Sequence, residues 1–131
     1  MGFINLSYDG ATPQIDAGLT AAPTAAVLGR AQVGPDAVLA ALSVIRADGH
    51  DVKIGASFSL GRAATVHIAH ETIATQIGDG VAVGADAVVH ACTVGANCVI
   101  GAGAVILDGS VLADGVVMAP GAVAYPRSQL N

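Results

Sequence analysis

The chain has 131 residues, a length that suits one domain. Five Lys and Arg residues against ten Asp and Glu residues leave a net charge of −5, which disfavours binding to nucleic acid or to anionic membranes. The sequence shows neither a secretion signal nor an apolar segment of about 18 residues, so we expect a cytoplasmic protein without a membrane partner. Cys92 and Cys98 do not have the spacing of a zinc ribbon or a redox motif, and we interpret them as small buried residues.

A period of six residues runs through most of the chain. We expect residues 1–14 to form an N-terminal cap, residues 15–126 to form the repeats and residues 127–131 to form a tail. A helix would need a period of about 3.6, and the 17 glycines disfavour it further, so the repeats predict short strands joined by tight turns such as Asp108-Gly109. The recurring aliphatic positions are Val27, Val33, Leu39, Ile45, Ile54, Leu60, Val66, Ile77, Val83, Val89, Val94, Ile100, Ile106, Val111, Val117 and Val123.

This period resembles the hexapeptide-repeat family, in which three repeats make one triangular coil of a left-handed parallel β-helix. The resemblance implies an all-β, single-stranded solenoid of about six coils that fills residues 1–131 as a single domain. Its left-handedness comes from the family alone, because crossover connections are usually right-handed. The steps from Ile45 to Ile54 and from Val66 to Ile77 are longer than six residues, which predicts loops at two corners.

Winding three repeats into one coil turns the sequence into columns of stacked residues. Residues three repeats apart lie above one another at about the strand spacing of 4.8 Å. One column then holds Ile45, Val66, Val89 and Ile106. The residues that follow them form the neighbouring column of Arg46, His67, His90 and Leu107. Imidazoles one coil apart are plausible ligands of a single zinc ion, so the two stacked histidines are candidate metal ligands.

Two segments resemble the signatures of the γ-class carbonic anhydrases. Residues 44–55 read V-I-R-A-D-G-H-D-V-K-I-G, and residues 83–92 read V-G-A-D-A-V-V-H-A-C. The likeness extends over nearly the whole chain, although the sequence ends at Asn131, before the long C-terminal helix common in that family. We therefore expect a β-helix that lacks this helix. The resemblance also implies a homotrimer.

In that family zinc lies between subunits, held by two histidines of one subunit and one of its neighbour. His67 and His90 match the two ligands of one subunit. Arg46 and Asp48 match a charged pair that bridges subunits and helps to shape the active site, so we take them as supporting residues. The resemblance thus implies zinc or another divalent metal as the cofactor, and a small molecule as the substrate.

Three positions of the family site differ in this chain. Ala85 stands where the neighbour's histidine is expected, and a zinc ion with two protein ligands is weakly held. Asp86 or His70 could replace the missing ligand across the interface, although neither matches its position. Gly61 and Arg62 stand where the family carries Gln and Asp near the metal.

The sequence leaves three functions open, and whether the protein is an enzyme stays undecided. The first is a γ-carbonic anhydrase-like trimer with a degenerate metal site between subunits and weak or no hydration of carbon dioxide. The second is a metal-dependent lyase or hydrolase that acts on another small substrate. The third is a hexapeptide-repeat acyltransferase, for which His70 in the stretched step after Val66 is the candidate general base.

Overall fold

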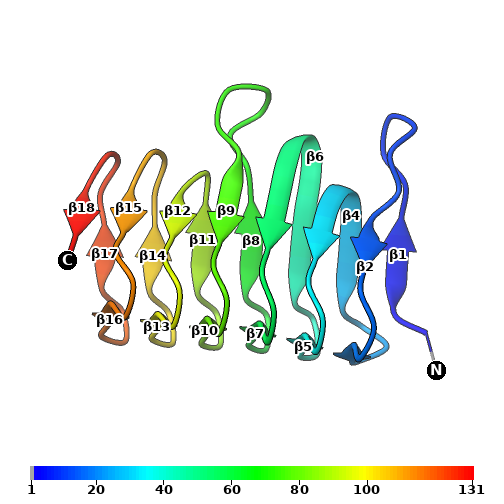
Figure 1. Cartoon of the computed structure of the whole chain (residues 1–131), viewed down its shortest axis with the longest axis horizontal. Coiled ribbons are helices and arrows are strands. Elements are labelled where there is room, and N and C mark those ends of the chain that lie inside the picture. The colour runs from blue at the N-terminus through cyan, green and yellow to red at the C-terminus, as the bar shows by residue number, and fades with distance from the viewer. Residues whose placement is uncertain (1) are drawn as a thin grey trace.

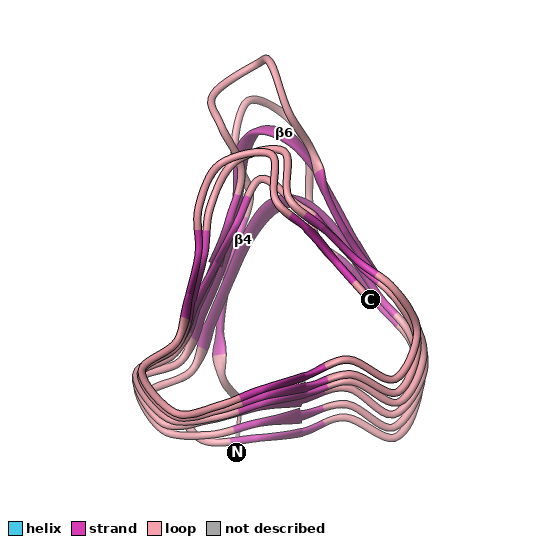
Figure 2. Ribbon diagram, turned by 90° about the vertical axis from the view of Figure 1, so that its left-hand side faces the viewer, coloured by secondary structure: helices cyan, strands magenta, loops and turns pink. Residues whose placement is uncertain are grey.

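The computed structural model describes residues 2–131, and Figure 1 shows them as one continuous coil of short strands. Seen along its long axis, this coil has a triangular outline (Figure 2). Every pairing between named strands is parallel. The predicted left-handed parallel β-helix is confirmed. Within the described range no helix occurs, and therefore none that could cross a membrane.

The strands form three flat faces. The first face contains β1 (Ile4–Leu6), the first part of β4 (Ala26–Val33), the first part of β6 (Val44–Ile54), β8 (Thr65–His67), β11 (Val88–His90), β14 (Val105–Ile106) and β17 (Val123–Ala124). The second face contains β2 (Gln14–Ile15), the last parts of β4 and β6, β9 (Thr75–Ile77), β12 (Thr93–Val94), β15 (Val111–Leu112) and β18 (Gln129–Leu130). The third face contains β3 (Thr20–Ala21), β5 (Val38–Leu39), β7 (Ser59–Leu60), β10 (Ala82–Val83), β13 (Val99–Ile100) and β16 (Val117–Met118).

The aliphatic column predicted from the repeat is present inside the coil. Ile45 pairs with Val66, Val66 with Val89, and Val89 with Ile106. All four side chains are fully buried. A neighbouring column holds only small side chains, because the interior narrows where the third face meets the first: Ala25, Ser43, Ala64, Ala87 and Ala104. A single strand per face can therefore close a dry core made of Val, Ile and Ala.

The coils extend further at both ends than the repeat predicted. β1 lies inside the predicted cap and pairs with β4, and β18 lies inside the predicted tail and pairs with β15. The solenoid consequently has about seven turns instead of six. The sequence pattern missed β1 because all three of its residues are exposed, so no buried aliphatic residue marks it.

Candidate functional site

A cluster of ionisable side chains lies where the first face meets the second. We call Arg46, Asp48, His67, His90 and Asp108 the histidine vertex. β6 runs uninterrupted through this corner, whereas β8 ends at His67 and β11 ends at His90. The parallel register places His67 directly beside His90, so the predicted stacking of the two histidines is confirmed. Their ring centroids are 5.1 Å apart, and the ring planes are inclined by 72°.

Asp48 links Arg46 to His67 within one chain. Asp48 Oδ2 accepts a hydrogen bond from Arg46 Nη2 at 2.8 Å, and Oδ1 accepts one from His67 Nε2 at 2.8 Å. Burial raises the pKa of Asp48, but the hydrogen bonds from Arg46 and His67 outweigh it, and the pKa is lowered from its ordinary value. Asp48 is therefore an ionised acceptor at neutral pH. Arg46 and Asp48 thus form an ion pair within one chain, and Asp48 also holds one imidazole.

Asp108 holds the other imidazole, a role that sequence reasoning missed. Its Oδ1 lies 2.5 Å from His90 Nδ1. The expected turn is also present, since Gly109 has φ of 75° and the Ser110 amide donates a hydrogen bond to the Leu107 carbonyl at 3.2 Å. Asp108 follows His90 by 18 residues, which is the length of one coil of three hexads. This separation is the sequence signal that could have revealed the contact.

Thr75 fixes the end of β8 from inside the core, and sequence reasoning missed this residue as well. Its side chain is fully buried, and Oγ1 donates a hydrogen bond to the His67 carbonyl at 2.5 Å. The Ala91 amide donates to the same carbonyl at 3.1 Å. A threonine at the start of a core strand, directly after a long loop, is the only sequence signal. The backbone of His67 is thus held from both neighbouring segments.

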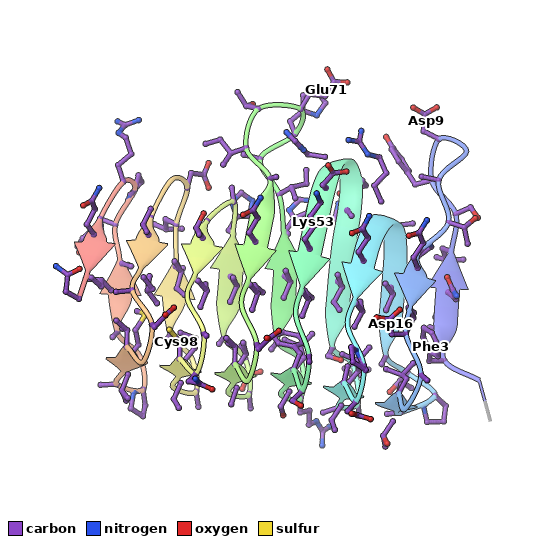
Figure 3. The ribbon with its side chains drawn as sticks, in the orientation of Figure 1. Phe3, Asp9, Asp16, Lys53, Glu71 and Cys98 are labelled. Carbon is purple, nitrogen blue, oxygen red and sulfur yellow. The ribbon has the colours of Figure 1, made fainter. Side chains whose placement is uncertain are left out.

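The predicted auxiliary ligands do not join the histidine pair within one chain. His70 lies in the loop between β8 and β9, which projects beyond the other corners (Figure 1). A cavity of about 100 Å³ beneath this loop is lined by Tyr8, Asp9, Arg30, Asp48, Gly49, His70 and Glu71. Figure 3 shows Glu71 on the projecting loop and Asp9 on the loop that follows β1. Asp86 precedes β11, whereas His90 ends it, so Asp86 lies at the opposite end of the first face.

The corner where the third face meets the first contains the positions that differ from the expected site. We call Gly61, Arg62, Ala85 and Asp86 the alanine vertex. The Asp86 amide donates to the Arg62 carbonyl at 2.9 Å, so these residues lie in adjacent coils. A Cβ at Gly61 would lie 2.6 Å from the backbone nitrogen of Ala85. Glutamine therefore cannot replace Gly61 unless the backbone moves.

The two imidazoles of the histidine vertex could supply two of the three protein ligands of a catalytic zinc site. Metal-binding histidines usually donate their second ring nitrogen to a carboxylate, and both imidazoles here have such a partner. His67 Nδ1 and His90 Nε2 make no hydrogen bond with residues 2–131. Over the same range, no group of three or more His, Cys, Asp or Glu side chains could hold a metal ion. A third ligand would have to come from another chain.

Cys92 lies directly behind this vertex and is chemically quiet. Its side chain is 2% exposed. Burial raises the pKa of the thiol from 9.0 to about 12, a hydrogen bond with the His90 backbone lowers it, and the charge of Asp108 raises it. Since the thiolate is the reactive form, Cys92 should not act as a nucleophile or a metal ligand at neutral pH. The structure places it as a small core residue, as the sequence predicts.

We expect the raised thiol pKa to weaken the fold in alkali. Between pH 9.0 and about 12 the unfolded chain loses a proton that folded Cys92 keeps, so stability falls as the pH rises. At about pH 10.5 the loss should be roughly 2 kcal/mol, at about 1.4 kcal/mol per pH unit. Urea unfolding at about pH 8 and 10.5 should show this extra loss in the parent but not in Cys92→Ala. Equal losses in both proteins would contradict the buried thiol.

Comparison with known proteins finds hexapeptide-repeat and γ carbonic anhydrase sequences that are similar to this chain. Residues 74–108 match the family described as bacterial transferase hexapeptide (six repeats). Gamma carbonic anhydrase 3, mitochondrial, from Arabidopsis thaliana is 35% identical over 88 residues, which cover 63% of this chain and 34% of the relative. Gamma carbonic anhydrase 2, mitochondrial, from the same plant is 34% identical over 88 residues, covering 63% and 32%. The resemblance to the γ carbonic anhydrases is confirmed. This chain spans about a third of the length of these relatives.

Solved structures share the architecture over almost the entire chain. A hexapeptide transferase family protein from Anaplasma phagocytophilum is 26% identical, with a TM-score of 0.91, and the match covers 96% of this chain and 74% of that protein. A putative acetyltransferase from Bacillus cereus is 24% identical, with a TM-score of 0.93, and the match covers 97% and 73%. The second likeness supports the fold alone.

Proposed function

We propose that this chain forms a γ-carbonic anhydrase-like homotrimer whose metal site between subunits is degenerate, so that it hydrates carbon dioxide weakly or not at all. The observation that carries this proposal is the division of the site between two vertices. Two oriented imidazoles lie at the histidine vertex, and the alanine vertex offers a methyl group at Ala85 where a third ligand is needed.

The outward side chains of the first face support the trimer. Apart from one threonine, they form an apolar stripe along the solenoid: Ile4, Ala26, Val44, Thr65, Val88, Val105 and Val123. The corresponding stripe of the second face is largely polar: Gln14, Gln32, Lys53, Gln76, Thr93, Val111 and Gln129. A long apolar patch on one face is typical of a protein interface. The first face is therefore the surface that we expect other subunits to cover.

The same arrangement brings the two vertices together. The histidine vertex and the alanine vertex are the two ends of the first face. If three such faces enclose a threefold axis, His67 and His90 of one protomer approach Ala85 of the next. A homotrimer is thus the assembly in which a complete site could form. Because this chain has Ala85 in place of a third histidine, the site stays incomplete.

The number of available ligands weakens metal binding in this assembly. Catalytic zinc sites usually have three protein ligands and an open position for water, and the bound metal lowers the pKa of that water to about 7. This chain supplies His67 and His90, each oriented by a carboxylate. We therefore infer zinc or another divalent metal only at low occupancy.

We give the other two functions less weight for chemical reasons. A metal-dependent lyase or hydrolase acting on another small substrate would need the same incomplete site. An acyltransferase would use His70 as its base, but the cavity that His70 lines is also lined by Asp9 and Glu71. These carboxylates repel the phosphates of an acyl-coenzyme A.

A cytoplasmic location stays a prediction, and the two plant relatives carry the word mitochondrial in their names.

A measurement of carbon dioxide hydration tests the catalytic part of the proposal. The purified protein should give kcat/KM below about 10⁴ M⁻¹s⁻¹, the lower end of the usual range for enzymes, with or without added zinc. Stopped-flow assays with a pH indicator provide the rate, and an active γ carbonic anhydrase serves as the positive control. A value of about 10⁶ M⁻¹s⁻¹ or more would contradict a degenerate site.

The apolar stripe makes a separate prediction about assembly. Val88→Asp places a charge in the middle of the first face and should convert the trimer into monomers, because burying an unpaired carboxylate is costly. Val99→Asp puts the same charge on the third face, where Val99 is 46% exposed, and should leave the trimer intact. Sedimentation velocity distinguishes the two masses. A trimer that tolerates Val88→Asp but not Val99→Asp would show that the third face is the interface.

A further inference from the structure

The two carboxylates of the histidine vertex bind different nitrogens of their imidazoles. Asp48 contacts Nε2 of His67, whereas Asp108 contacts Nδ1 of His90. The two rings are neighbours in one column, and each carboxylate approaches from a different segment. Asp48 comes from β6, one coil before His67, and Asp108 comes from the turn after β14, one coil after His90. The two imidazoles therefore lie between two hydrogen-bond acceptors, the carboxylates of Asp48 and Asp108.

The chemistry of a carboxylate fixes where each ring carries its proton. An ionised carboxylate can only accept a hydrogen bond, so the nitrogen that it contacts must carry the hydrogen. In a neutral imidazole the other nitrogen then has a free lone pair. A neutral His67 ring therefore carries its hydrogen on Nε2 and its lone pair on Nδ1. A neutral His90 ring carries its hydrogen on Nδ1 and its lone pair on Nε2.

We propose that Asp48 and Asp108 are positioning residues that hold these adjacent histidines in opposite tautomers, which leaves Nδ1 of His67 and Nε2 of His90 as the lone-pair nitrogens of the site. This inference rests on the proposed function for its consequence, because these are the nitrogens that a metal ion would meet. It does not rest on that function for its test. The tautomers belong to the metal-free protein and can be read there.

Asp108 is the residue whose positioning role is easiest to isolate. Its side chain is 42% exposed, and its only side-chain hydrogen bond within residues 2–131 is the one to His90. Asp48 also binds Arg46, so its removal would disturb two partners at once. Loss of an outer carboxylate typically weakens metal binding by about 10–100-fold. Asp108→Ala should therefore alter the site and leave the coil intact.

Nitrogen NMR on histidine-labelled protein tests the inference directly. Four histidines are present, so His50→Gln and His70→Gln variants assign the signals of the other two. With metal removed and both rings neutral, His90 should show a protonated Nδ1 and His67 a protonated Nε2. In Asp108→Ala the Nδ1–H form of His90 should become the minor one, while His67 is unchanged. The control Asp16→Ala removes an exposed carboxylate elsewhere and should change neither ring.

The result that would overturn the inference is a shared tautomer in the parent protein, or a His90 ring that ignores Asp108→Ala. A zinc titration of the same samples separates this inference from the proposed function. Opposite tautomers in a protein that takes up no zinc at all would preserve the positioning roles and reject a residual metal site. Zinc binding with identical tautomers would preserve the residual metal site and reject the positioning roles.

Discussion

Ala85→His should raise the affinity of the trimer for zinc by at least about 100-fold, since loss of a mere outer partner already costs about 10–100-fold. The new imidazole would lie at the alanine vertex and meet His67 and His90 of the neighbouring protomer. Three imidazoles plus water complete the usual ligand set of a catalytic zinc. Isothermal titration of metal-free protein measures the change. Hydration of carbon dioxide should rise in the same variant.

Ala102→His is the matched control for this gain. Val83 pairs with Ile100, so Ala102 occupies the same corner as Ala85 but one coil further along the solenoid. A histidine there lies at the level of Leu107 and not of His90, and it should leave zinc affinity unchanged. Gly61→Gln is unsuitable as an added restoration, because the Cβ would collide with the backbone of Ala85. Equal gains from Ala85→His and Ala102→His would contradict the proposed arrangement of the protomers.

Phe58→Ala should destabilise the protein by about 3–5 kcal/mol, the usual cost of deleting a fully buried phenylalanine. Phe58 is 0% exposed and is the largest side chain in a core made mainly of Val, Ile, Leu and Ala. Its carbonyl bonds to the Val38 amide, and the Val81 carbonyl bonds to the Ser59 amide, so Ala37 and Val81 are its neighbours in the stack. Ala37 is too small to fill the cavity that the substitution would leave.

Urea unfolding at a fixed protein concentration measures this loss, since the stability of an oligomer depends on concentration. Val117→Ala is the control, because Val117 is 72% exposed and its truncation should change stability by less than about 0.5 kcal/mol. A loss below about 1 kcal/mol for Phe58→Ala would show that neighbouring coils collapse into the cavity. Such a result would contradict a core that is closely packed at this level.

The winding of the chain could be predicted because most repeats place a buried aliphatic residue at the same six-residue spacing. Ile45, Val66, Val89 and Ile106 are all buried, and the stacking of their neighbours His67 and His90 follows from the register. The stretched steps did not disturb this prediction. The loop predicted between Ile45 and Ile54 is instead part of the continuous strand β6, and residues 68–74 project as a loop at the same corner (Figure 1). The stacking of residues three repeats apart was therefore enough to predict that His67 and His90 are neighbours.

The hydrogen bonds around the imidazoles could not be predicted in the same way. Asp108 reaches His90 from the turn between Ile106 and Val111, a step that has five residues instead of six. Thr75 binds the His67 carbonyl only because a seven-residue loop, residues 68–74, returns the chain to that point. Side-chain direction at such corners depends on loop geometry and not on hydrophobic period. Strand β1 escaped prediction for a related reason, since an end coil need not bury its residues.

We propose that three chains assemble around a metal site that has lost one ligand. Native mass spectrometry of the purified protein, after exchange into a zinc-containing volatile buffer and then into a zinc-free one, tests it in a single spectrum. We expect the mass of three chains with substoichiometric zinc. A monomer, or a trimer that retains one zinc ion per chain through the exchange, would contradict it.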